Sequence, residues 1–376
     1  MRRQRETRFH FVLSHRYLPF LSLLIALWSI AIFPTWLLGE EPPSANAKNK
    51  KEKVVIEPDA KANPQYWAAR KLQMRFGLQF QSNDNHCKEL FATIPFPRDW
   101  PEQKVKILNA DLPDFARYKE RELPGGVKQL VIEVPVLAAN RLIDVVVTVE
   151  IEKFFIKPPE DPTSLVYPKK TLKDKELVWS FGDSPYIDTK SRQIRVIAKE
   201  IKDKGPENAW QHVEFIFDWV RDNIQYRNGT IRTTQEALKD KFGDCEEMTG
   251  LFVAVCRASN IPARCVWIPE HCYPEFYLED VNGFGHWFPC QAAGDRQFGE
   301  MREYRPILQK GDRFKVPEHT ALQRYVAEFF TCKQRSTGPT PPNVVTIRDL
   351  GELQAELEKI KSSTEPQPAP PQPATP

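Results

Sequence analysis

The sequence predicts an α+β protein, in which an all-β domain resembling a sandwich precedes a domain of helices packed on an antiparallel sheet. Short apolar or alternating runs, broken by Pro, Gly, Asn and Asp, fill residues 72–160. Amphipathic helical patterns follow at 207–226 and after Cys245, and a strand with a hairpin is expected over 264–291. The 376 residues suffice for two domains of modest size.

Residues 1–47 have the layout of an export segment. Arginines at five of the first 16 positions precede the uncharged run "LPFLSLLIALWSIAIFPTWLL" at 18–38. This run is long for a signal-peptide core of about 7–15 residues and just long enough to span a bilayer at about 20. Ala45-Asn46-Ala47 offers a cleavage site, so a cleaved signal peptide and a membrane anchor both stay open. In either case we expect an extracytoplasmic protein, periplasmic, secreted or membrane-anchored.

The next segments define the expected domain order. Residues 48–71 are rich in Lys, Glu, Pro and Ala and are typical of a flexible linker. Residues 72–160 alternate Val, Ile and Phe at period two, which predicts an antiparallel β domain without a chemical motif, and hence a support or recognition module. The proline-rich stretch 157–170 marks a boundary, and we expect the second domain over 175–335.

Helical periodicity is clear in "ENAWQHVEFIFDWVRDNIQY", residues 207–226, where five apolar residues form a stripe typical of a buried helix face. They are Val213, Ile216, Phe217, Val220 and Ile224. Beyond this domain, residues 336–376 are expected to form a C-terminal helix and a disordered Pro-rich tail ending in "STEPQPAPPQPATP".

Cys245 lies directly behind Gly243 and Asp244, at the predicted start of a helix in "KFGDCEEMTGLFVAVCRASNIPAR". Apolar residues recur at helical spacing from Met248 to Cys256, while Asn260 and Pro262 supply the stop. At a helix N-terminus, free backbone N–H groups and the helix dipole are expected to lower a thiol pKa from about 8.5. The same N–H groups could hold an oxyanion. A nucleophilic role requires a base as well, since a cysteine is by default a small core residue.

The following hairpin offers that base. In "RCVWIPEHCYPEFYLEDVNGFGHWFPCQ", residues 264–291, period-two alternation sets His271 and Glu275 on one face and Cys272 and Phe276 on the other. If Phe288 and Cys290 match the apolar face, Gln291 lies on the side of His271. The exact register is not fixed by the sequence.

These residues resemble the transglutaminase-like superfamily of papain-fold thiol enzymes, in its bacterial exported form. "FGDCEEMTGLFVAVCRASNIPAR", "HCYPEFYL" and "HWFPCQ" look like that family's Gly-x-Cys helix, its His-x-Trp-x-Glu strand and its Trp-x-Pro-x-Asp strand. Order and spacing agree over roughly residues 205 to 300. The resemblance implies a papain-like core, with Cys245 as nucleophile and His271 as general base and acid.

Two residues depart from the family pattern. Tyr273 stands where the family usually has Trp, and Gln291 stands where the third catalytic residue is usually Asp. An amide oxygen can hold the imidazole in the right tautomer but stabilises its positive form less well, although papain-like enzymes use Asn in this role. Gln291 is thus the expected third catalytic residue, with Glu275 and Asp295 as alternative orienters.

The expected function is an exported thiol hydrolase or transferase that attacks a carboxamide or peptide bond of a protein or peptide through a cysteine thioester. Hydrolysis, as in a protease or amidase, is favoured over cross-linking. The alternative is a catalytically inactive binding or scaffold protein that keeps the fold, which Gln291 motivates.

Composition bears on nucleic-acid binding, metal binding and disulfide formation. A net charge of +3, from 53 basic and 50 acidic residues without a basic stripe, argues against a nucleic-acid partner. The seven cysteines include no Cys-x-x-Cys pair and match no zinc spacing, so neither a metal nor another cofactor is expected. Cys272 and Cys290 are either a disulfide or, as their apolar face favours, two core thiols.

Overall fold

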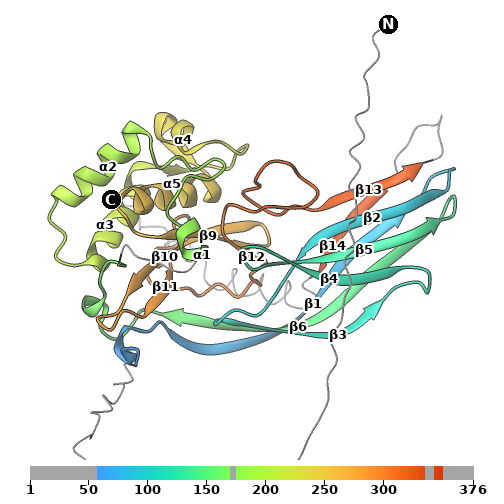
Figure 1. Ribbon diagram of the computed structural model, residues 1–376, viewed down its shortest axis with the longest axis horizontal. Helices are drawn as coiled ribbons and strands as arrows, with labels where there is room; N and C mark the ends of the chain where they lie inside the picture. Colours follow the sequence, from blue (N-terminus) through green and yellow to red (C-terminus); the bar gives the residue numbers. More distant parts are fainter. Residues whose placement is uncertain (1–56, 170–174, 335–342, 350–376) are drawn as a thin grey trace, which may run out of the picture. The chain divides into compact units, whose positions relative to one another are not determined.

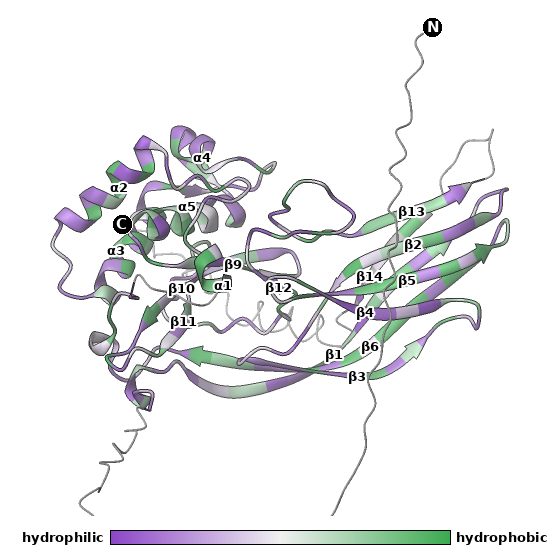
Figure 2. Ribbon diagram, viewed as in Figure 1, coloured by the Kyte–Doolittle hydropathy of each residue, from purple (hydrophilic) through white to green (hydrophobic). Residues whose placement is uncertain are grey.

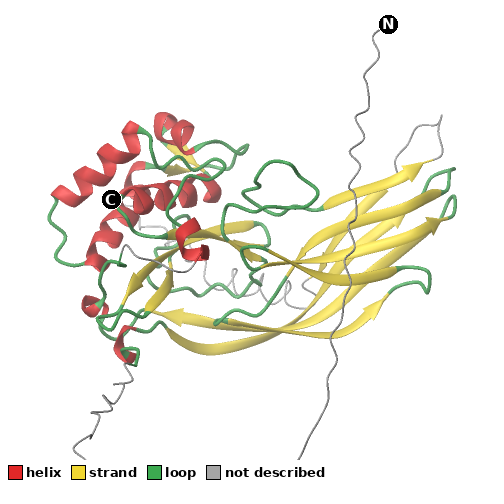
Figure 3. Ribbon diagram, viewed as in Figure 1, coloured by secondary structure: helices red, strands yellow, loops and turns green. Residues whose placement is uncertain are grey.

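The β region forms two four-stranded antiparallel sheets in the computed structural model, which describes residues 57–169, 175–334 and 343–349 (Figures 1 and 3). The strand orders are β14-β1-β6-β3 and β13-β2-β5-β4. The strands are β1 (Gln65–Gln81), β2 (Cys87–Phe96), β3 (Gln103–Asp111), β4 (Arg117–Leu123), β5 (Val127–Leu137), β6 (Leu142–Lys157), β13 (Phe329–Gln334) and β14 (Asn343–Asp349). The expected sandwich is confirmed.

One apolar core lies between these two sheets, because every second residue of a strand points to the same side. Along β1 the buried residues from Leu72 to Phe80 alternate, and their neighbours on β6 are Ile143 to Ile151. Gly77 is required by this pairing, since a Cβ there would lie 2.1 Å from the carbonyl oxygen of Val145. Figure 2 shows green hydrophobic bands interrupted by purple and white ones along these strands.

Strands β13 and β14 differ from the domain boundaries expected from the sequence. β13 pairs with β2, although residues 329–334 were expected in the second domain, and β14 pairs with β1, where a C-terminal helix and tail were expected. Both strands are edge strands, so their hydrophobic pattern is short and easily missed. The chain therefore returns to the sandwich after its second domain.

The second domain places helices against a four-stranded antiparallel sheet of order β11-β10-β9-β12, which confirms the α+β fold class (Figure 1). Its strands are β9 (Ala263–Ile268), β10 (His271–Glu279), β11 (Gly285–Pro289) and β12 (Gln309–Lys310). Its helices are α1 (Lys175–Trp179), α2 (Arg192–Asp203), α3 (Ala209–Asn223), α4 (Thr234–Asp240) and α5 (Cys245–Ala258). Two short strands, β7 (Gln225–Tyr226) and β8 (Phe242–Gly243), pair in parallel just before α5.

Helix α5 is the centre of this domain. It packs against β9 and β10 as well as α2, α3 and α4, so its residues from Glu247 to Arg257 are buried on every side. The predicted apolar stripe of α3 is buried in the same core. Cys245, the first residue of α5, is thereby fixed relative to the sheet.

The hairpin of β10 and β11 shares its two faces as predicted, and the structure gives its register. Phe276 pairs with Phe288, and the turn closes over residues 280–284, where the Asp280 carboxylate accepts the Phe284 N–H at 2.8 Å. Phe276, Phe288, Cys272 and Cys290 all face the core under α5. The opposite face carries His271 at the start of β10.

Buried charges join the sandwich to the second domain. The Lys310 ammonium lies 2.5 Å from Glu102 and 2.6 Å from Glu275, and all three side chains are buried. Gln103 adds two hydrogen bonds with the backbone of Ile307. Lys153 on β6 is also fully buried, and it lies beside Glu102, Glu275 and Lys310.

Several sequence expectations fall outside the described residues. These are the export segment 1–47, the first part of the linker and the Pro-rich tail after residue 349. Of the expected linker 48–71, residues 60–62 form a 3₁₀ turn and 65–71 already belong to β1. In the part of the chain that the structure describes, no helix combines the length and apolarity needed to cross a bilayer.

Candidate active site

Cys245 begins α5, as predicted, because a capping box defines the helix start. The Asp244 carboxylate accepts the N–H groups of Glu246 at 2.8 Å and Glu247 at 3.4 Å. The Glu247 carboxylate in turn accepts the Asp244 N–H at 2.8 Å and the Arg232 N–H at 2.8 Å. Two N–H groups of the first turn are thus occupied, and the N–H of Cys245 itself is not capped by Asp244.

The Cys245 thiol lies against the start of β10. Thr249, one turn further along α5, donates a hydrogen bond to the Cys272 carbonyl oxygen at 3.2 Å. The backbone N–H groups of Cys272 and Cys245 lie near the sulfur and lower its pKa. Helix and strand therefore meet where His271 and Cys272 begin the strand.

The predicted low pKa of Cys245 is wrong. Burial, followed by the negative charge of Asp244, raises the pKa of Cys245 to about 11, against the two N–H groups that lower it. The Asp244 carboxylate, which caps the helix, lies next to the thiol and disfavours its negatively charged form. The resting side chain at neutral pH is the thiol.

His271 and Gln291 are brought together as the alternation predicted. Nε2 of His271 lies 2.8 Å from Oε1 of Gln291. Because an amide oxygen can only accept, Nε2 carries the proton and Nδ1 is left as the basic nitrogen. Burial lowers the pKa of His271, while the Gln291 hydrogen bond raises it less. The imidazole is therefore a neutral base at pH 7.

The two alternative orienters lie elsewhere. Glu275 is buried between Lys310 at 2.6 Å and Arg264 at 2.9 Å, and Asp295 is exposed. Neither forms a hydrogen bond with His271 among the contacts of the described residues. Gln291 is the side chain that holds the imidazole.

The thiol and the imidazole are not hydrogen-bonded to each other in the described part of the chain, although both flank the junction of α5 and β10. Since both groups are neutral at pH 7, this site has no resting thiolate–imidazolium pair.

Glu303 and Arg305 are neighbours of His271 that the sequence did not reveal. Arg305 binds the Glu303 carboxylate at 2.6 and 3.0 Å and donates to the Pro269 carbonyl oxygen at 3.0 Å, in the turn just before β10. Arg305 lowers and Glu303 raises the pKa of His271. They lie in an irregular loop, whose sequence has no periodicity from which this contact could be predicted.

Tyr226 also lies close to the thiol. The pairing of β7 with β8 sets Tyr226 beside Gly243, two residues before Cys245. Burial, then the charges of Cys245 and Asp244, raise the pKa of Tyr226, and the ring is half exposed. A phenol at this position can contact a molecule that approaches the sulfur.

The remaining cysteines do not add to the site. All seven are free thiols, and Cys272 and Cys290 are buried in the core of the second domain, as the sequence favoured. In the described residues no group of three or more His, Cys, Asp or Glu side chains is placed to hold a metal ion.

Comparison with known proteins gives a family match that contains Cys245, His271 and Gln291. Residues 195–292 match the model of the transglutaminase-like superfamily, a span that begins in α2 and ends just past Gln291. No curated protein sequence matches the chain.

Two solved structures are similar to the chain. One is a proposed cysteine protease from Cytophaga hutchinsonii, with 15% identity, 75% of this chain and 99% of that chain covered, and a TM-score of 0.49. The other is a proposed protease from Parabacteroides distasonis, with 14% identity, 63% and 48% covered, and a TM-score of 0.26. By the family match, this chain contains a domain of the transglutaminase-like superfamily, over residues 195–292.

Proposed function

We propose that the protein is a thiol enzyme that cleaves or transfers an acyl group at a carboxamide or peptide bond. The observation that carries the proposal is the 2.8 Å contact between His271 Nε2 and Gln291 Oε1, which leaves Nδ1 as the basic nitrogen. His271 directly precedes Cys272, whose N–H lies near the Cys245 sulfur. The family match supports the same assignment. The proposed substrate is a protein or peptide.

In the proposed reaction, Nδ1 of His271 takes the proton of the Cys245 thiol as the sulfur attacks the carbonyl carbon. The carbon–nitrogen bond then breaks, and the imidazolium returns the proton to the departing amine. A thioester with Cys245 remains. Water or a second amine attacks the thioester carbonyl carbon and passes a proton to Nδ1. The carbon–sulfur bond then breaks, which releases an acid or a new amide, and the sulfur takes the proton from Nδ1 to become the thiol again.

The oxyanion formed during attack needs donors close to the sulfur. Since Asp244 occupies the N–H groups of Glu246 and Glu247, the available main-chain donors are those of Cys245 and Cys272. An oxyanion-hole donor typically contributes about 10²–10³ in kcat. In this proposal, the capping box determines which N–H groups stay free to bind the oxyanion.

A location outside the cytoplasm is part of the proposal. It is supported by the arginine-rich N-terminus and the uncharged run at 18–38, which serves either as a signal peptide or as a membrane anchor. Mass spectrometry of the mature N-terminus distinguishes the two, with Lys48 as first residue if cleavage follows Ala47.

The test is to incubate the full chain with glutamine-containing peptides and a fluorescent primary amine. Mass spectrometry separates a cleaved peptide, a deamidated glutamine and an amine adduct, and so identifies the reaction. Cys245→Ala should abolish every product, and His271→Ala should lower the rate by about 10²–10⁴. Cys332→Ser, in the sandwich, is the matched control and should keep full activity. Product formation that survives Cys245→Ala would refute the proposal.

The second candidate is an inactive binding protein with this fold. It is favoured by two observations: Gln291 is neutral, and the pKa of Cys245 is raised to about 11. It predicts no product and no acyl-enzyme with any peptide, and equal peptide affinity in the wild type and Cys245→Ala. An acyl-enzyme mass adduct on Cys245 would exclude it.

A further inference from the structure

Cys87 and Cys332 lie side by side in the sandwich, although the entire second domain separates them in the sequence. Strand β13 pairs with β2 at the edge of its sheet (Figure 1). Gln334 lies opposite Cys87, so Cys332 is the diagonal neighbour of Cys87. Both cysteines face the core between the two sheets, where Cys87 is 2% exposed and Cys332 is half-buried.

The two thiols share a hydrogen bond. Burial, then the neighbouring Cys332, raises the pKa of Cys87. Burial also raises the pKa of Cys332, but the hydrogen bond with Cys87 lowers it in part. Since Cys332 is also the more exposed of the two, it is the thiol better able to form a thiolate and attack a disulfide from solution.

The backbone around Cys332 is held on one side only. Two residues of β2, Glu89 and Leu90, lie opposite this one residue of β13, which interrupts the pairing as a β-bulge. Within its sheet, β13 pairs with β2 and has no strand on its other side. Diagonal neighbours lie roughly 7 Å apart at their Cα atoms, close to the longest separation that a disulfide spans. A small movement of the edge strand toward β2 would bring the two sulfurs to bonding distance.

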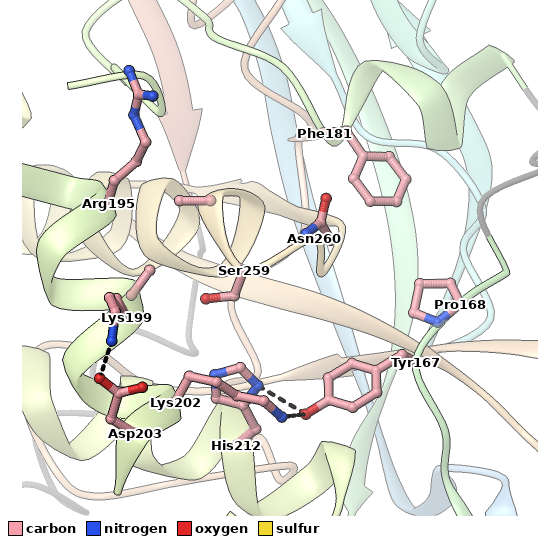
Figure 4. A pocket seen from close by; sticks show the side chains of 12 residues that line it. Tyr167, Pro168, Phe181, Arg195, Lys199, Lys202, Asp203, His212, Ser259 and Asn260 are labelled. Atoms are coloured by element: carbon pink, nitrogen blue, oxygen red, sulfur yellow. Dashed lines mark hydrogen bonds and ion pairs between the residues drawn. The ribbon is translucent and has the colours of Figure 1, made fainter. Parts of the chain in front are cut away.

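Cys332 is open to a small molecule. It lines a surface hollow of about 480 Å³ together with Phe91, Val134 and Lys333. Ligand-binding cavities typically measure about 300–1,000 Å³. By contrast, the cavity of about 850 Å³ between α2, α3 and the end of α5 has no cysteine among the described residues that line it (Figure 4). A small disulfide therefore meets a thiol in the hollow of the sandwich and none in the cavity of the second domain.

Cys265 and Cys272 provide a comparison within the same chain. They are diagonal neighbours on β9 and β10, since Cys272 lies opposite Trp267, and their thiols also share a hydrogen bond. However, they are only 3% and 2% exposed, and the cavity beside Cys265 measures about 10 Å³, which is too small for an organic disulfide. The two pairs have similar neighbours and differ in access from solution.

We propose that Cys87 and Cys332 form a disulfide by exchange with a low-molecular-weight disulfide, and that this bond fastens β13 to β2. The Cys332 thiolate attacks one sulfur of the small disulfide, whose S–S bond breaks, and one small thiolate leaves and takes up the proton that Cys332 lost. The Cys87 thiolate then attacks the Cys332 sulfur, and the second small thiolate leaves with the proton of Cys87. Two protein thiols are oxidised and one small disulfide is reduced to two thiols.

The site does not depend on Cys245 being catalytic, and its test uses oxidised glutathione as the small disulfide. The full chain is incubated with this probe, its remaining thiols are blocked with N-ethylmaleimide in denaturant, and its peptides are identified by mass spectrometry. The Cys87 peptide should be joined to the Cys332 peptide, while Cys265 and Cys272 stay reduced. Recovery of Cys87 and Cys332 as blocked thiols, or as partners of other cysteines, would overturn the proposal.

Variants test the order of exchange and the fastening of β13. Cys87→Ala should leave glutathione trapped on Cys332, and a variant without this adduct would refute the first attack by Cys332. In the wild type, the disulfide should raise the melting temperature by about 5–10 °C, and dithiothreitol should reverse the shift. Cys332→Ser should melt at the same temperature under both conditions, whereas Thr331→Ser, at the exposed neighbour, should keep the shift. A linked wild type that melts with the reduced form would overturn the fastening of β13 by this bond.

Discussion

Oε1 of Gln291 lies 2.8 Å from Nε2 of His271, so the imidazole is oriented by an amide that carries no charge. The hydrogen bond fixes which nitrogen is basic, but it cannot stabilise an imidazolium as a carboxylate would. With a half-buried thiol of pKa about 11 nearby, the site holds two neutral groups at rest.

Replacing Gln291 by Glu places a carboxylate where the amide oxygen lies. A neighbouring negative charge favours the protonated imidazole, so the pKa of His271, which burial lowers, should rise. NMR titration of the imidazole measures this directly, and the acid limb of kcat/KM should move to higher pH with it. Asp295→Asn, at an exposed carboxylate, should move neither. An unchanged titration in Gln291→Glu would contradict the assigned contact.

Alkylation of Cys245 by iodoacetamide should follow the raised pKa. The rate should still be increasing with pH between 9 and about 11, because only the thiolate reacts. A short peptide with the same cysteine should level off near its ordinary pKa of about 8.5. His271→Ala should leave the pH dependence in place, since no hydrogen bond joins the two side chains. Labelling that is already fast and pH-independent below pH 8 would instead demonstrate a resting thiolate.

Gly243 and Gly250 offer a matched pair of alanine substitutions around α5. A Cβ at Gly243 would lie 2.7 Å from Cβ of Glu247, so the first turn carrying Cys245 would have to shift. A displacement of about 1 Å can cost roughly 10²-fold in rate, so Gly243→Ala should lose most of its acyl-transfer activity. At Gly250 the nearest atom is 3.4 Å away, and alanine should stabilise the helix by about 0.5–1 kcal/mol. Kinetics and denaturant unfolding of both variants check this, and equal activities would be inconsistent with it.

Because of Lys153, the free energy of unfolding should change with pH in the alkaline range. Burial lowers its pKa from 10.5 to about 8, so between these values the unfolded chain binds more protons than the folded one. The contribution of this side chain to the free energy of unfolding should therefore rise with pH across that window, by roughly 3 kcal/mol in all. The measurement is the difference in unfolding free energy between the wild type and Lys153→Met at several pH values, in which other titrating groups cancel. A difference that stays constant from pH 7.5 to 10.5 would mean that burial does not lower the pKa of Lys153 in the folded chain.

The sequence predicted the parts of this site that depend on local pattern. Period-two alternation was enough to set His271 and Gln291 on one side of a hairpin, since one face had to be apolar. Helix periodicity and the Asp244 cap were enough to locate the start of α5. These features are decided by residues close together in the chain.

The rest depends on contacts between distant segments. The pKa of Cys245 follows from burial, which the helix pattern alone does not report, and its sign was predicted wrongly for that reason. Arg305 reaches Pro269 across 36 positions, from a loop without periodicity. Strand β14 pairs with β1 across more than 260 residues, and a short edge strand in a Pro-rich region gives little signal.

The return of the chain to the sandwich has a consequence for synthesis. Both sheets take an edge strand, β13 or β14, from the last 50 residues, after the entire second domain. The chain is synthesised from its N-terminus onward, so one edge of β1 and one edge of β2 stay unpaired until the residues after the second domain have been made. An unfinished chain would expose these strand edges to aggregation, which makes prompt arrival of the C-terminal strands a condition for productive folding.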